Sequence, residues 1–75
     1  MAKRSITIAG HRTSVSIEEP FWRALGDIAA SKGTSLAALI ADIDQARQPN
    51  SNLSSAIRVA VLAWYRDKAE AANVE

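Results

Sequence analysis

Residues 13–20 read TSVSIEEP, and they decide the fold because two hydrophobic periods meet there. Val15 and Ile17 alternate with hydroxyl side chains, which is typical of a strand with one buried face. The two acids and the proline that follow Ile17 are a helix-start signal, since acids complement the positive end of a helix dipole and proline is tolerated in a first turn. The stretch therefore predicts a strand that leads directly into a helix.

Downstream of this stretch, apolar residues recur at helical spacing in three segments. Gly33 follows a lysine and predicts a left-handed helix end, and Thr34 or Ser35 is placed to cap the next helix. The cluster QPNSN breaks the pattern, and Asn52 at its end is the expected cap of the last helix. We expect a strand at 12–17, helices at 18–32, 35–47 and 53–70, a loop at 48–52, and fraying within 69–75.

The residues before the strand have an alternating pattern of their own. Ile6 and Ile8 fall on even positions, whereas the apolar residues of the strand fall on odd ones. One continuous strand cannot present both pairs on one face, so Gly10 is expected to mark a bend, a bulge or a turn. We expect residues 1–11 to be an N-terminal arm, and the sequence leaves open whether residues 4–8 form a second strand.

The chain of 75 residues is expected to be a single domain (1–75), and so small a core is marginal without reinforcement. It has no cysteine and one histidine, which excludes a disulfide scaffold, a thiol nucleophile and an imidazole-rich metal site. Oligomerisation is the remaining reinforcement. A lone strand leaves both edges unpaired, so we expect Val15–Ile17 to pair antiparallel with a second copy in a homodimer. The apolar stripe of the last helix could join two dimers into a tetramer.

Positive charge is concentrated near the N-terminus. Residues 1–17 carry Lys3, Arg4 and Arg12 without an acid, a net +3, whereas residues 18–75 carry six basic and eight acidic side chains, a net −2. This asymmetry favours a polyanionic partner. No segment is apolar enough to span a membrane, and the start lacks the apolar core of a signal peptide, so we expect a cytoplasmic protein without membrane contact.

Several motifs in this order resemble one known family. The strand-to-helix stretch over residues 13–19, the Gly33-Thr34-Ser35 turn between two apolar helices, and the spacing of Ile17 from Gly33 are similar to a ribbon-helix-helix domain over about residues 12–46. That family comprises bacterial and phage DNA-binding proteins. The resemblance implies a mainly α fold, in which one N-terminal strand pairs across a dimer, helices follow, and the two-stranded ribbon enters the DNA major groove.

A longer pattern resembles a short bacterial subfamily with an added C-terminal helix. It consists of Ile6-Thr7-Ile8, Gly10-His11, Thr13-Ser14, Phe21-Trp22 and Asn52–Arg58. This subfamily pattern covers most of the chain, which the minimal domain does not. The third helix at 53–70 is therefore expected to be a regular part of the fold.

The resemblance also implies which side chains meet DNA. Arg12, Ser14 and Ser16 lie opposite the inward Val15 and Ile17 and are expected to contact bases, since arginine can grip guanine and serine can donate or accept. The start of the second helix is expected to hold a phosphate with its free amides. The expected phosphate contacts are Lys3, Arg4, His11, Gly33, Thr34 and Ser35, and the expected dimer core is Val15, Ile17, Phe21, Leu25, Ile28, Leu36, Leu39, Ile40 and Ile43.

The sequence favours a sequence-specific DNA-binding regulator over an enzyme, because its serines have only one histidine as a partner and it has no glycine-rich phosphate loop. Nothing in it implies a cofactor or a metal ion. Trp22, Trp64 and Tyr65 lie on amphipathic helices and are expected to pack in the core or between subunits. Two alternatives stay open: a scaffold of the same fold that does not bind DNA and assembles through its third helix, and an antitoxin-type autorepressor.

Overall fold

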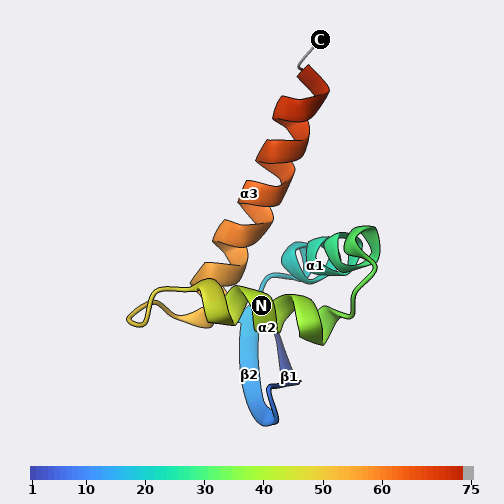
Figure 1. Ribbon diagram of the computed structural model, residues 1–75. Coiled ribbons are helices and arrows are strands. Elements are labelled where there is room, and N and C mark those ends of the chain that lie inside the picture. Colours follow the sequence, from blue (N-terminus) through green and yellow to red (C-terminus); the bar gives the residue numbers. More distant parts are fainter. Residues whose placement is uncertain (74–75) are drawn as a thin grey trace.

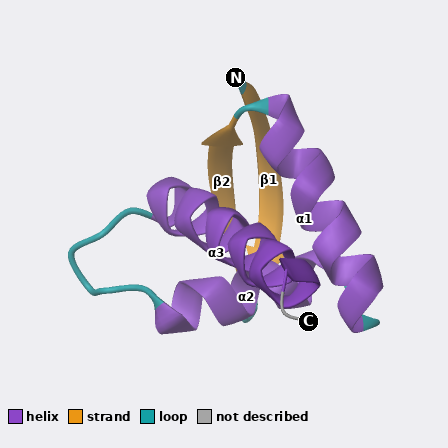
Figure 2. Cartoon of the chain, turned by 90° about the horizontal axis from the view of Figure 1, so that it is seen from above, coloured by secondary structure: helices purple, strands orange, loops and turns teal. Residues whose placement is uncertain are grey.

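The computed structural model describes residues 1–73 as an antiparallel hairpin followed by three helices (Figure 1). The elements are β1 (Ala2–Ile8), β2 (His11–Ile17), α1 (Glu19–Lys32), α2 (Leu36–Ala46) and α3 (Leu53–Asn73). The helices pack on one face of the hairpin, and the distal half of α3 extends beyond the rest of the chain (Figures 1 and 2). The architecture is the predicted ribbon-helix-helix arrangement with an added C-terminal helix.

The two strands of the ribbon pair with each other within one chain. Ala2 lies opposite Ile17 and Ile8 opposite His11, so each pair joins an even-numbered residue to an odd-numbered one. The change of parity in the sequence is therefore what brings the apolar residues of both strands to one face. This pairing corrects the expectation of an N-terminal arm over residues 1–11, because most of them form a strand. It also corrects the expectation that β2 pairs with the same strand of a second copy, because within the chain β1 is its antiparallel partner.

The hairpin turn consists of Ala9 and Gly10, whose φ angles are 51° and 82°. Positive φ at both central residues is the requirement of a type I′ turn, the two-residue connection whose twist matches that of the flanking strands. Gly10 adopts this backbone without strain, whereas the Cβ of Ala9 makes it costly. The turn thus places one favourable and one unfavourable residue in left-handed conformations.

We expect Ala9→Asn to raise the free energy of unfolding by about 0.5–1 kcal/mol, because asparagine tolerates a left-handed backbone and Asn-Gly is a preferred type I′ pair. Denaturant unfolding, followed by tryptophan fluorescence, measures the change. Ala9→Val is the matched control and should lower the stability, since a β-branched residue is strained at positive φ. Destabilisation of similar size by both substitutions would contradict this turn geometry.

The core lies between the inner face of the hairpin and the three helices. No polar or charged side chain of the described residues is buried in it. Ile17, Leu25, Ile40 and Ile57 are completely shielded from solvent and come from β2, α1, α2 and α3 in turn. The other buried residues are Ile8, Val15, Trp22, Ile28, Ala29, Leu39 and Val61. Every element of the chain therefore contributes to one core.

On α1 two neighbouring aromatic residues are buried to different degrees within one chain. Trp22, which was expected in the core or between subunits, is 3% exposed, whereas Phe21, one of the expected dimer-core residues, is partly buried. Trp22 can be buried because its indole N–H has an acceptor: Nε1 donates to the carbonyl oxygen of Ala2 at 2.9 Å. This hydrogen bond attaches the start of β1 to α1. On α2, Leu36 and Ile43 are likewise only partly buried.

The helix ends follow the signals in the sequence. Gly33 ends α1 with a φ of 67°. Ser35 caps α2, because its hydroxyl accepts a hydrogen bond from the backbone N–H of Ala38 at 3.1 Å. The side chain of Asn52 caps α3 by accepting from the N–H of Ser55 at 2.8 Å. Each cap satisfies a backbone donor that the helix itself leaves unpaired.

The third helix is longer than predicted. It runs to Asn73 rather than to residue 70, since residues 69–72 are alanines and a glutamate, which are strong helix formers. Fraying was expected because large apolar side chains are absent after Lys68. The helix nevertheless continues to Asn73, because the intrinsic helix propensity of these residues is high. The rest of that expectation falls on Val74 and Glu75, which lie outside the described residues.

Candidate nucleic-acid interface

One face of the hairpin points away from the helices and carries only polar side chains. Alternate residues of paired strands share a face, and Val15 and Ile17 face the core. The opposite face therefore holds three cross-strand pairs, Lys3–Ser16, Ser5–Ser14 and Thr7–Arg12. They comprise two cations, four hydroxyls and no carboxylate. We call this surface the ribbon face.

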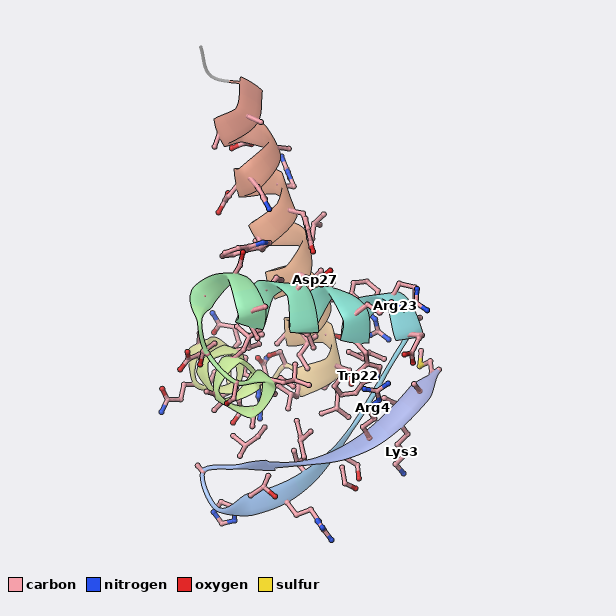
Figure 3. All side chains as sticks on the ribbon, turned by 90° about the vertical axis from the view of Figure 1, so that its right-hand side faces the viewer. Lys3, Arg4, Trp22, Arg23 and Asp27 are labelled. Carbon is pink, nitrogen blue, oxygen red and sulfur yellow. The ribbon has the colours of Figure 1, made fainter. Side chains whose placement is uncertain are left out.

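The two cations of the ribbon face are available to a ligand. Lys3 and Arg12 are exposed, and neither forms an ion pair with another of the described residues. Figure 3 shows Lys3 on the side of the hairpin that faces away from α1. The hydroxyls between them provide donors and acceptors, since Ser5, Thr7 and Ser14 are exposed and Ser16 is partly buried. A polyanion that approaches this face therefore meets no negatively charged side chain on it.

The structure brings the expected base-contacting residues Arg12, Ser14 and Ser16 together on the ribbon face. It adds Ser5 and Thr7 from β1, a segment for which the sequence left open whether it forms a second strand. Their signal was the alternation of hydroxyl and isoleucine side chains before Gly10. That alternation could not be assigned to a face before the pairing of the two strands was known.

Arg4, which was expected to contact a phosphate, lies on the other face of the hairpin. It pairs with Val15 across the strands, so alternation directs its side chain toward the helices. Its Nη2 is 3.1 Å from Glu19 Oε1, and its guanidinium lies 5.0 Å from the centroid of the Trp22 ring (Figure 3). This arginine therefore fixes β1 against α1 and does not belong to the ribbon face.

Of the remaining expected phosphate contacts, Lys3 lies on the ribbon face and the others lie apart from it. His11 is exposed beside the turn, where it pairs with Ile8 at the end of the hairpin. Gly33, Thr34 and Ser35 form the connection between α1 and α2, which lies to one side of the hairpin (Figure 1). The hydroxyl of Ser35 is already used as a helix cap, so its segment offers a ligand mainly the first backbone amides of α2.

A second ion pair holds α3 against the end of the ribbon. Nε of Arg58 donates to Glu18 Oε1 at 3.0 Å, and the guanidinium lies 5.9 Å from the centroid of the Phe21 ring. The hydrogen bond from Arg58 holds the pKa of the Glu18 carboxyl below its usual value. Glu18 directly follows β2, so this ion pair links the third helix to the strand that carries Arg12. Sequence reasoning missed this interaction, because its two partners lie 40 residues apart in the chain.

A family model described as a ribbon-helix-helix domain matches residues 1–65 of the chain. The match includes both strands, α1, α2 and most of α3. The chain belongs to the ribbon-helix-helix family. No curated protein and no solved structure matches it.

Ribbon-helix-helix domains are generally DNA-binding transcription regulators that bind DNA as dimers, and they are typically not enzymes. In this ribbon-helix-helix chain, none of the helices within residues 1–73 is long and apolar enough to cross a membrane. Over the same residues, no three histidine or acidic side chains gather closely enough to hold a metal ion. The polar ribbon face is thus the surface of the described chain best suited to a charged partner.

Proposed function

We propose that this ribbon-helix-helix protein binds double-stranded DNA sequence-specifically as a homodimer and regulates transcription in the bacterial cytoplasm, where the DNA lies. The observation that supports it is the composition of the ribbon face, with two cations, four hydroxyls and no carboxylate. A two-stranded ribbon fits the major groove, which is about 12 Å wide. The face therefore combines attraction to phosphates with groups that can discriminate base edges.

The side chains of the ribbon face have different roles in this proposal. Arg12 donates two hydrogen bonds to O6 and N7 of a guanine, the commonest specific contact in the major groove. The hydroxyls of Ser5, Ser14 and Ser16 contact neighbouring base edges. Lys3 neutralises a phosphate at the end of the ribbon farthest from the turn. The first amides of α2, after Ser35, hold a second phosphate.

A pool of random duplexes offers the direct test of sequence-specific binding. We expect repeated selection with the full chain to converge on a defined site. Binding to that site should weaken with salt, with a slope of log K against log salt of about −4 to −7 if a dimer neutralises roughly four to eight phosphates. Measurement at several salt concentrations gives the slope.

Lys3→Ala should make this slope less steep by about one unit for each copy that contacts the DNA. Lys68→Ala is the matched control, because Lys68 is an exposed cation on the distal half of α3, and it should leave the slope unchanged. Failure of the selection to converge, or a slope near zero, would contradict the proposal and favour a scaffold that does not bind DNA.

A further inference from the structure

Two consecutive glutamates at the junction of β2 and α1 each hold an arginine from another element. The carboxylate of Glu18 accepts from Nε of Arg58 on α3 at 3.0 Å, and that of Glu19 accepts from Nη2 of Arg4 on β1 at 3.1 Å. The two guanidiniums also lie 5.9 Å and 5.0 Å, respectively, from the centroid of the aromatic ring three residues after each glutamate. The junction is therefore tied on one side to the ribbon and on the other to the third helix.

Glu18 is the residue that connects the ribbon to the helices. β2 ends at Ile17 and α1 begins at Glu19, and Figure 2 shows how short this connection is. A side chain at this position commonly caps the helix, but that of Glu18 makes no capping hydrogen bond among the described residues. Its carboxylate accepts from Arg58 instead, and this hydrogen bond holds its pKa below the usual value. The residue about which the ribbon can turn is thus held by α3.

A small rotation at this connection displaces the far end of the ribbon. Strand residues are spaced by about 3.4 Å, so Arg12 lies roughly 20 Å along β2 from Glu18. A tilt of about 10° would move the backbone at Arg12 by roughly 3–4 Å, which is more than a hydrogen bond to a base tolerates. The apolar core holds the ribbon against the helices without directional preference, whereas the hydrogen-bonded ion pair has a defined geometry. The ion pair can therefore fix an angle that the core alone leaves soft.

We propose that Arg58 is a positioning residue through which the third helix sets the angle of the ribbon. Its side chain touches neither a base nor a phosphate, and it acts on DNA binding through Glu18. The part of this inference that concerns DNA rests on the proposed function, whereas the effect on the ribbon angle does not. The first turns of α3 then belong to the DNA-binding unit, although they lie outside the ribbon face.

The angle of the ribbon can be measured without DNA. The chain has no cysteine, so His11→Cys beside the hairpin turn and Ala69→Cys on α3, both at exposed positions, provide two sites for spin labels. An excess of unlabelled chain limits the measured distances to those within one copy. We expect a narrow distance distribution, which Arg58→Gln or Glu18→Gln should broaden or shift. Arg66→Gln, which removes an exposed cation about two turns further along α3, is the matched control and should leave the distribution unchanged.

Binding to the selected DNA site separates positioning from charge. Arg58→Gln removes a cation and Glu18→Gln removes an anion, so an effect of charge alone would weaken binding in the first variant and strengthen it in the second. If Arg58 acts through Glu18, both substitutions should weaken binding by about 3- to 10-fold in a dimer with two such ion pairs, with the salt slope unchanged. Glu70→Gln, which removes an exposed acid of α3, is the control for the lost anion.

An exchange of the two charges provides the rescue. Glu18→Arg and Arg58→Glu each place like charges side by side, whereas the double variant restores an ion pair of opposite polarity with the net charge unchanged. We expect the double variant to have a narrower distance distribution, and to bind the selected site more tightly, than either single variant. Stronger binding after Glu18→Gln, or a distance distribution that neither glutamine substitution changes, would overturn the proposal.

These measurements distinguish the positioning role from the proposed function. A chain whose ribbon angle depends on Arg58 and Glu18 but that selects no DNA site contradicts only the proposed function. A chain that selects a site and binds it equally well in all of these variants contradicts only the positioning role.

Discussion

Ile17→Ala is expected to lower the free energy of unfolding by about 2–4 kcal/mol, the usual cost of removing a large aliphatic side chain from a packed core. Ile17 has no exposed surface and lies at the end of β2, immediately before the residues that begin α1. A chain of this length is stable by roughly 4–11 kcal/mol, so the substitution removes a large share of the total. Denaturant unfolding followed by the fluorescence of buried Trp22 measures the effect.

Ser14→Ala is the control for this experiment, since Ser14 lies on the same strand but on the ribbon face. Its replacement should change the free energy of unfolding by no more than about 0.5 kcal/mol, as for other exposed sites. If Ser14→Ala costs as much as Ile17→Ala, the two faces of β2 are assigned the wrong way round. Every residue of the ribbon face would then be wrong, because a shift of one position exchanges the faces of a strand.

Arg12→Ala is expected to weaken binding to the selected DNA site by about 1–3 kcal/mol for each guanine that the arginine no longer grips, or roughly 5- to 150-fold. The effect should be concentrated at one base position, where the variant no longer prefers guanine. Stability should change by less than about 0.5 kcal/mol, because the side chain is exposed and has no ion pair among the described residues. Sequence-resolved binding and thermal unfolding of the same variant separate the two effects.

Arg23→Ala provides a control of the same charge and size. Arg23 is exposed on α1, away from the ribbon face (Figure 3). Its removal should leave both the affinity for the selected site and the base preference nearly unchanged. Equal weakening by Arg12→Ala and Arg23→Ala would mean that binding depends only on overall positive charge, which contradicts base contact by Arg12.

The helices could be predicted because their signals are local. Gly33, Ser35 and Asn52 act on backbone groups within a few residues, so their effects can be inferred from a short stretch of sequence. Which of Phe21 and Trp22 is buried more deeply within one chain is not decided locally. It depends on the acceptor that Ala2 supplies from β1, twenty residues earlier in the chain.

The ribbon face could be predicted only in part for a related reason. The alternation in β2 was enough to group Arg12 with Ser14 and Ser16. The pairing of β1 with β2 depends on a turn in which Ala9 has positive φ, a conformation that alanine rarely adopts. With the turn unassigned, Arg4 and Lys3 looked equivalent, although the structure places them on opposite faces of the hairpin.

A ribbon made from one chain differs in symmetry from a ribbon shared by two identical strands. A ribbon shared by two identical strands has two-fold symmetry, so it matches a palindromic DNA sequence. Here the end near the helices carries Lys3 beside Ser16, whereas the end near the turn carries Arg12 beside Thr7. If the protein binds DNA as proposed, such a face gives each copy a direction on the DNA, so the half-site under each copy need not be palindromic. The inverted repeat of an operator would then arise only between half-sites, at a spacing set by how the two copies are joined.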